Sequence, residues 1–184
     1  MRTLLSKWVV ALALFGAGAA WADQTDPDLD SLFDILETSG APAEVHAAEQ
    51  LIWRAWMRHE NETFDSMMRE GTRAMNAGRL ERAAELFTDL VEQAPDYSEA
   101  WNKRATVYFL QGELDRSAAD VDRTLELEPR HFGALSGLGQ IELLRGNGEA
   151  AIEAFQGALD IHPYLPGLPE LIESLEETVR GREL

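Results

Sequence analysis

Residues 99–129 read EAWNKRATVYFLQGELDRSAADVDRTLELEP, and this stretch decides the fold. Its first half contains large apolar residues and ends at Gly112, and its second half ends at Pro129. Glycine takes a positive φ without a Cβ clash, and proline cannot continue a helix, so both residues are typical of helix ends. The stretch therefore predicts two short helices joined by a tight turn, which is a helical hairpin.

The same pattern recurs on both sides of this stretch at an interval of 34 residues. Pro95, Pro129 and Pro163 close three blocks of that length, which are residues 64–97, 98–131 and 132–165. Each block has a glycine at its fifteenth position and small residues at its eighth and twentieth positions, with larger apolar residues at the fourth and twenty-fourth. Small residues let two helices approach, and the larger ones fill the space beside that contact. Because one hairpin leaves an apolar face exposed, we expect the three hairpins to stack around a continuous core.

These positions are the ones that define tetratricopeptide repeats, and the second block resembles that family most clearly. At the family's spacings it carries Trp101, Ala105, Tyr108, Gly112, Leu114 and Pro129. The resemblance covers 102 of the 184 residues. It implies an all-α fold, a short α-solenoid of three tetratricopeptide hairpins with an N-terminal helical pair and a C-terminal capping helix. Arg104 stands where the family usually has leucine, and Gly148 where it usually has a large residue, so both should weaken local packing.

The segments that flank the repeats are also predicted to be helical. Residues 166–184 have apolar residues at helical spacing, which predicts a helix that caps the last hairpin. Residues 23–63 combine an acidic stretch with a degenerate hairpin, in which Gly40 ends the first helix and Pro42 opens the second. We expect this hairpin to stack on the first repeat, and the alternative is a separate docking element. Stacking would cover apolar residues that otherwise form an exposed patch, namely Leu51, Ile52, Trp53 and Trp56.

Residues 1–22 have the order of a cleaved secretory signal. Two basic residues precede a short apolar run, and Ala20-Trp21-Ala22 comes just before the acidic Asp23. The apolar stretch from Trp8 to Trp21 has 14 residues, fewer than the roughly 20 that span a bilayer. We therefore expect cleavage after Ala22 and no stable membrane insertion afterwards. The predicted location is the periplasm if the source is a Gram-negative bacterium, and otherwise the protein is secreted.

The composition argues against several classes of function. There are 33 acidic and 16 basic residues, a formal net charge of −17, and no cysteine. This charge repels phosphate backbones, so nucleic acid is not an expected partner. Without cysteine there is no disulfide framework, no thiolate zinc site and no cysteine nucleophile.

No pattern of catalytic or metal-ligating residues is found. The four histidines are scattered singly, which favours surface or repeat-junction roles over metal ligation. Neighbouring carboxylates such as Asp120 and Asp122 are most simply interpreted as solvated helix faces. We therefore predict that the protein is not an enzyme and has no catalytic residue, cofactor, metal site or small-molecule substrate.

The family resemblance implies a concave groove, lined by the first helices of successive repeats, that holds a peptide or helix of a partner protein. It assigns to this groove Met68, Arg69, Thr72, Met75, Asn102, Lys103, Thr106, Phe109 and Gln140. One subset of the family clamps a C-terminal carboxylate with basic and amide side chains. This sequence has Met68, Thr72, Gly133 and Gly137 at those positions, so the clamp is absent. The two glycines are expected to provide close helix packing or a bare groove wall.

Charge is distributed unevenly between the two helices of each repeat. The first-helix segments 64–77, 98–111 and 132–145 hold five basic and four acidic residues, a net +1. The rest of the three repeats holds five basic and fourteen acidic residues, a net −9. The sequence thus predicts an acidic outer wall around a nearly neutral groove.

We predict an exported protein-interaction module, an adaptor or assembly factor, with partner anchors on Met68, Met75 and Phe109 and an acidic partner group near Arg69 and Lys103. Another interpretation of the basic residues is pairing on the helix surface, such as Arg69 with Asp65. Alternatives for the function are a holdase-like binder of unfolded exported proteins and a structural subunit of a permanent envelope complex.

Overall fold

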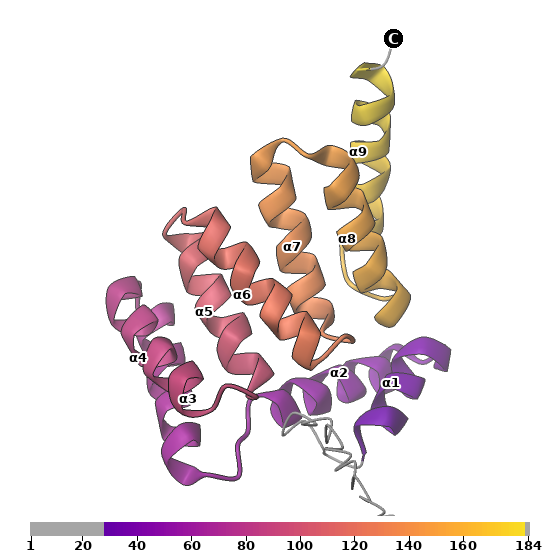
Figure 1. Cartoon of the computed structure of the whole chain (residues 1–184). Helices are drawn as coiled ribbons and strands as arrows, with labels where there is room; N and C mark the ends of the chain where they lie inside the picture. Colours follow the sequence, from indigo (N-terminus) through magenta and orange to yellow (C-terminus); the bar gives the residue numbers. More distant parts are fainter. Residues whose placement is uncertain (1–27, 183–184) are drawn as a thin grey trace, which may run out of the picture.

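A computed structural model describes residues 28–182, which form nine α-helices and no strand (Figure 1). The helices are α1 Leu29–Thr38, α2 Pro42–Trp56, α3 Glu62–Asn76, α4 Leu80–Gln93, α5 Ser98–Leu110, α6 Leu114–Leu127, α7 Phe132–Arg145, α8 Gly148–Ile161 and α9 Leu168–Arg182. The predicted all-α solenoid is confirmed: α3–α4, α5–α6 and α7–α8 are the three hairpins, and α9 packs on α8. No described helix is long and apolar enough to cross a membrane. The predicted export signal, residues 1–22, lies outside the described residues.

The turn glycines and the small helix-facing residues act as the repeat pattern predicts. Gly78, Gly112 and Gly146 have φ values of 70°, 78° and 81°, and each lies just after the first helix of its hairpin. At the eighth repeat position, a Cβ on Gly139 would lie only 2.3 Å from the Phe155 ring. The close contact between the two helices of a repeat therefore depends on glycine at this position.

The two departures from the family pattern have structural partners. Arg104 on α5 donates two hydrogen bonds to the Asp120 carboxylate on α6, at 2.7 and 2.8 Å, in place of an apolar contact. Asp120 is buried, so the interpretation of this carboxylate as solvated is wrong. Gly148 makes room for α9, because a Cβ there would lie 2.9 Å from Val179 Cγ2. Neither departure leaves the packing open.

Replacing Arg104 with leucine, the usual family residue, is expected to destabilise the protein by about 2 kcal/mol. The substitution leaves the buried Asp120 carboxylate without its guanidinium partner. The double variant Arg104→Leu/Asp120→Ala should regain most of that loss, because it removes the unpaired charge as well. Urea unfolding of the three proteins measures this. A single variant as stable as the wild type would contradict a coupled pair.

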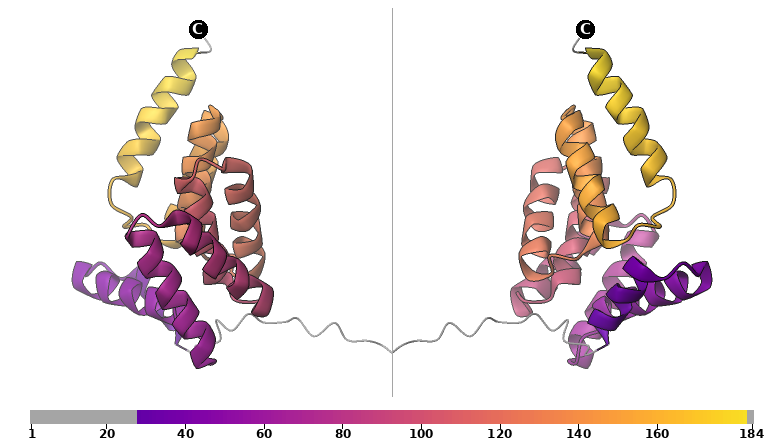
Figure 2. Two further views of the ribbon diagram at one scale, coloured as in Figure 1. Left: turned by 90° about the vertical axis from the view of Figure 1, so that its left-hand side faces the viewer. Right: turned by 90° about the vertical axis from the view of Figure 1, so that its right-hand side faces the viewer.

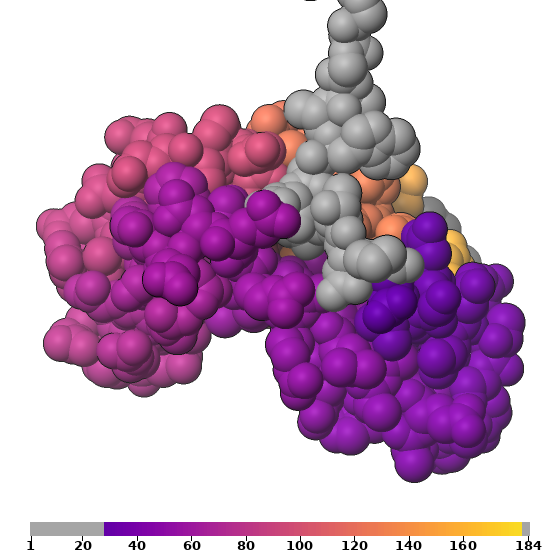
Figure 3. Space-filling view, turned by 90° about the horizontal axis from the view of Figure 1, so that it is seen from below, coloured from indigo at the N-terminus to yellow at the C-terminus, as the bar shows by residue number. Residues whose placement is uncertain are grey.

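The N-terminal hairpin α1–α2 packs against the third repeat and the cap, not the first repeat. Phe33 of α1 and Ile52 and Trp56 of α2 share one buried cluster with Phe132 of α7 and Phe155 of α8. In Figure 1 the hairpin lies below α7 and α8, and Figure 3, seen from below, shows it as a lobe beside the first repeat. The predicted stacking on the first repeat is therefore wrong. The expectation that its apolar face is covered holds, because the third repeat provides that cover.

Polar contacts also hold this hairpin to the C-terminal half of the chain. Arg130, between α6 and α7, pairs with Asp30 of α1 at 2.8 Å, and its guanidinium lies 4.2 Å from the centre of the Phe33 ring. The Tyr164 hydroxyl donates to the Ser39 carbonyl at 3.0 Å. The side views in Figure 2 show the hairpin at the bottom of the molecule and α9 running upward away from it to the C-terminus.

Candidate functional site

The candidate site is a hollow between α5 and α7, which we call the α5–α7 groove. Its volume is about 170 Å³. Its walls carry no charged side chain and are formed by Asn102, Ala105, Thr106, Phe109, Ser117, Val121, Gly133, Gly137, Gln140 and Ile141. At the ends of α5 and α7, Leu110 and Leu144 are 54% and 64% exposed. They occupy the same repeat position, so two neighbouring repeats present equivalent apolar side chains.

Two glycines of α7 give the groove two different ends. A Cβ on Gly137 would have no heavy atom within 4 Å, so this part of the wall is open. A Cβ on Gly133 would lie 2.6 Å from Cη2 of Trp53, which comes from α2. The sequence left close packing and a bare wall as alternatives. The structure shows close packing at Gly133 and a bare wall at Gly137.

Helix α2 closes the Gly133 end of the groove with aromatic contacts. The Trp53 ring meets Phe132 and His131 edge to face, with centroids 5.3 and 5.6 Å apart. Trp56 stacks on His131, with centroids 4.1 Å apart and planes at 12°. Lys103 lies over the Trp53 ring, 5.7 Å from its centre, a cation–π contact. The hairpin thus covers groove positions that the family resemblance assigned to a partner.

A buried carboxylate lies beneath this closed end. Glu99 of α5 is fully buried, and its Oε1 lies 3.0 Å from Lys103 Nζ. Its Oε2 accepts from Asn102 and lies 2.9 Å from His131 Nε2. Because His131 Nδ1 accepts from the Ala134 N–H, the ring proton is on Nε2 and is donated to Glu99. Burial would raise the pKa of Glu99, but Lys103 and the His131 hydrogen bond outweigh it and lower the pKa to about 2.

The hairpin forms one wall of the groove. Its side chains in the shared core are nearly inaccessible, among them Leu36, Ile52 and Trp56. Each large apolar side chain that is buried stabilises the fold by about 1.5–3 kcal/mol, so these contacts favour the docked position of α2. We therefore expect a partner to meet the groove with α2 in place.

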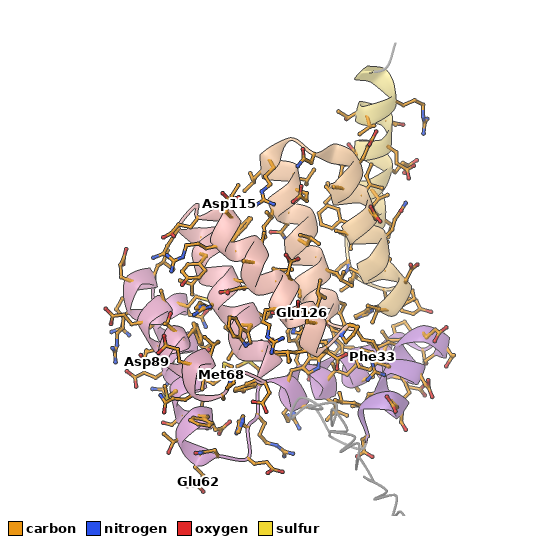
Figure 4. The ribbon with its side chains drawn as sticks, viewed as in Figure 1. Phe33, Glu62, Met68, Asp89, Asp115 and Glu126 are labelled. Atoms are coloured by element: carbon orange, nitrogen blue, oxygen red, sulfur yellow. The ribbon has the colours of Figure 1, made fainter. Side chains whose placement is uncertain are left out.

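The structure brings together four of the nine predicted groove residues: Asn102, Thr106, Phe109 and Gln140 line the α5–α7 groove. The other five lie outside this hollow. Met68, labelled in Figure 4, is completely buried in the core of the first repeat, so the prediction that it anchors a partner is wrong. Thr72 and Met75 are half-buried on α3.

The two basic residues of the predicted site are already paired within the chain. Arg69 pairs with Asp65 one turn earlier on α3, and Lys103 pairs with Glu99. The surface-pairing interpretation of Arg69 is therefore the one that the structure supports. On the second helices of the repeats, Asp89 of α4 and Asp115 and Glu126 of α6 are exposed, and Figure 4 labels all three.

Sequence reasoning missed Trp53 and His131 as groove residues. His131 lies 32 residues after its partner Glu99, close to one repeat length, and this interval was the available signal. Trp53 carried no such signal, because its place depends on which repeat the hairpin contacts. The predicted repeat-junction role of the histidines holds for His131 and His162, both buried between helices.

A second hollow, of about 400 Å³, lies between α1 and α2 outside the groove. Leu51 and Arg54 of α2 contribute to it, together with Arg58 just after that helix, and all three are exposed. Within residues 28–182 no three histidine or carboxylate side chains are grouped as a metal ion would need. The groove has no charged lining residue, whereas this hollow is lined by Asp28 and two arginines, so the two surfaces differ chemically.

Known proteins share both the repeat pattern and the fold. The tetratricopeptide repeat matches residues 68–125 and 111–166. A TPR repeat-containing protein of Rhizobium etli is 32% identical over 153 residues, which are 83% of this chain and 75% of that protein.

Two solved structures are similar in fold. One is the first TPR of Spaghetti (RPAP3) bound to an HSP90 peptide, with a TM-score of 0.63, 15% identity, and coverage of 66% of this chain and 96% of that one. The other is the Yersinia enterocolitica type III secretion chaperone SycD with a peptide of the translocator YopD, with a TM-score of 0.60, 14% identity, and coverage of 68% and 98%. The repeat match, the Rhizobium relative and the three stacked hairpins agree: the chain belongs to the tetratricopeptide repeat family.

Proposed function

We propose that this protein is an exported adaptor or assembly factor that binds a short segment of a partner protein in the α5–α7 groove. The observation that carries the proposal is the hollow between α5 and α7, two helices whose last turns expose Leu110 and Leu144 to solvent. Exposed apolar side chains beside a concave site are typical of protein-binding surfaces. The two peptide-bound structures of similar fold support a peptide as the kind of ligand.

The size of the groove favours a defined segment over the holdase-like alternative. A hollow of about 170 Å³ accommodates one or two side chains, whereas a binder of unfolded chains needs a broad apolar surface. The acidic outer wall opposes nonspecific association with other acidic proteins. We infer a non-enzymatic role from the lining of the groove, because its two hydroxyl groups, on Thr106 and Ser117, donate to backbone carbonyls and no general base lines the groove.

Export to the periplasm is part of the proposal and rests on residues 1–22. The order of a basic start, a short apolar run and Ala20-Trp21-Ala22 supports cleavage after Ala22. N-terminal sequencing of the protein recovered from its compartment tests this directly. A recovered chain that still begins at Met1 would contradict export by cleavage.

Site-specific photo-crosslinking in intact cells tests the groove as the partner site. A photoreactive amino acid at Gln140 is expected to capture a partner protein, because this exposed side chain lines the groove. The same amino acid at Glu85, exposed on α4, is the matched control and should capture none. A third position, Leu51, reports on the hollow between α1 and α2.

Crosslinks at Gln140 and not at Glu85 or Leu51 would support the groove. A partner captured from Leu51 alone would place binding on the N-terminal hairpin and contradict the proposal. Equal capture from all three positions would also contradict it, because it would indicate contact without a defined site.

A further inference from the structure

We propose that the partner segment inserts an uncharged apolar side chain over Gly137, and that a carboxylate is not the group recognised. This inference rests on the proposed function and deepens it by naming the chemistry of the ligand. We call the part of the groove at Gly137, which Phe109 and Gln140 also line, the Gly137 subsite. It departs from the acidic partner group that the sequence favoured.

The charges near the groove are neutralised within the chain, which removes the basis for recognising an acid. Lys103 is paired with the buried Glu99, and Arg69 with Asp65. Arg145, at the end of α7, pairs with Asp115 and Glu142 at 2.6 and 2.7 Å. A carboxylate that entered the groove would lose hydration without gaining a free cation, and this desolvation is unfavourable.

The shape of the groove favours an apolar side chain instead. Gly137 has no heavy atom within 4 Å of the position of a Cβ, so its wall has room for an incoming group. Phe109 and Ile141 provide apolar walls, and Leu110 and Leu144 expose further apolar surface in the last turns of α5 and α7. Burying one aliphatic or aromatic side chain there would contribute through the hydrophobic effect, which salt does not screen as it screens charges.

Gln140 supplies a polar group suited to the backbone of such a segment. It is exposed and lines the groove, and its amide makes no hydrogen bond to any of the described residues. An amide offers both donors and an acceptor, so it matches a peptide N–H or C=O without requiring charge. The other polar side chains of the lining, Asn102, Thr106 and Ser117, donate to groups within the chain. The subsite thus combines the apolar walls of Phe109 and Ile141 with the uncharged amide of Gln140.

Filling the subsite by substitution tests the inference. Gly137→Leu places a side chain into open space, and a leucine also favours the helix over a glycine, so the variant should fold. Gln156→Leu is the matched control, because it adds the same side chain at an exposed position of α8. The probe is the neutral dye N-phenyl-1-naphthylamine, and its anionic counterpart is 8-anilinonaphthalene-1-sulfonate.

We expect the neutral dye to bind the wild type and Gln156→Leu equally, with an affinity that changes less than twofold between about 0.05 and 0.5 M salt. Gly137→Leu should weaken binding of the neutral dye at least tenfold. The affinity of Gly137→Ala should lie between those of the wild type and Gly137→Leu. Circular dichroism checks that each variant is folded. If Gly137→Leu does not fold, Gly137→Ala is used for the test in its place. Neutral-dye binding that is unchanged by Gly137→Leu overturns the inference.

A second result would also overturn it. The wild type would bind the sulfonate more tightly than the neutral dye, and sulfonate binding would fall steeply with salt and be lost in Gly137→Leu. That combination would show that the subsite binds an anion. These failures are distinguishable from failure of the proposed function. If Gln140 still captures a partner while one of these two contradicting dye results is obtained, the groove remains the partner site and only the apolar subsite is disproved.

Discussion

Replacing Trp56 with alanine is expected to destabilise the protein by about 3–5 kcal/mol. The side chain is fully buried where α2 meets the third repeat, and its ring contacts those of Phe33, His131 and Phe132. Truncation would remove these contacts and leave a cavity that a core built from two hairpins cannot easily close. For a chain of this length, the melting temperature should fall by roughly 10 °C or more. Urea and thermal unfolding followed by circular dichroism measure both quantities.

The same variant tests whether the hairpin is one unit with the repeats. A fixed hairpin predicts one transition that moves to lower denaturant as a whole. Leu51→Ala, on the exposed side of the same helix, is the control and should change stability by less than about 0.5 kcal/mol. A Trp56→Ala protein whose repeats unfold at the wild-type midpoint, after a separate early transition, would contradict the docked arrangement.

Replacing Glu99 with glutamine is expected to destabilise the protein at neutral pH by roughly 3 kcal/mol. This figure follows from a pKa lowered from the ordinary 4.5 to about 2 by Lys103 and the hydrogen bond from His131, despite the opposing effect of burial. A carboxyl group whose pKa is lower in the folded state stabilises the fold above its unfolded pKa. That contribution is lost as the pH falls through the folded pKa.

The difference between wild type and Glu99→Gln should therefore be largest above about pH 5 and should shrink between about pH 4.5 and 2. Urea unfolding at pH 7, 4 and 3 measures the trend. Glu85→Gln, exposed on α4, is the control and should change little at any pH. A difference that stays constant down to pH 3 would show that the Glu99 charge is not what stabilises the cluster.

The repeat architecture was predictable from the sequence because it depends on local and periodic features. The positive φ of Gly78, Gly112 and Gly146 follows from helix termination, and the contact of Gly139 with Phe155 follows from the spacing of the eighth and twenty-fourth positions. Each is a relation within one repeat. A period of 34 residues, repeated three times, makes such relations visible without any knowledge of the tertiary structure.

The position of the N-terminal hairpin was not predictable in the same way. Its apolar face shows that something covers it, but the pattern does not indicate which repeat provides the cover. Burial of Met68 and of the Glu99–Lys103 pair likewise depends on tertiary contacts, although the pair itself joins residues one turn apart on α5. Family positions assign Met68 and Lys103 to the groove, yet Met68 lies in the core of the first repeat, and Lys103 pairs with Glu99 beneath Trp53.

Prediction of the groove was accordingly most successful where the hairpin does not reach. Asn102, Thr106, Phe109 and Gln140 line the open part, whereas the wall at Gly133 is covered by Trp53. Two effects, the docking of α2 and the internal ion pairs, together make the groove shorter and uncharged. Fixing α2 on the third repeat closes one end of the groove, and internal ion pairs neutralise the cations around it.

The most direct test is the affinity of the crosslinked partner segment for the wild-type protein, Gly137→Leu and Gln156→Leu. A synthetic peptide of that segment, titrated by calorimetry, should bind the wild type and Gln156→Leu equally. It should bind Gly137→Leu at least tenfold more weakly, a loss of about 1.4 kcal/mol or more. Equal affinity for all three folded proteins would contradict the account, because the partner would then not enter the groove between α5 and α7.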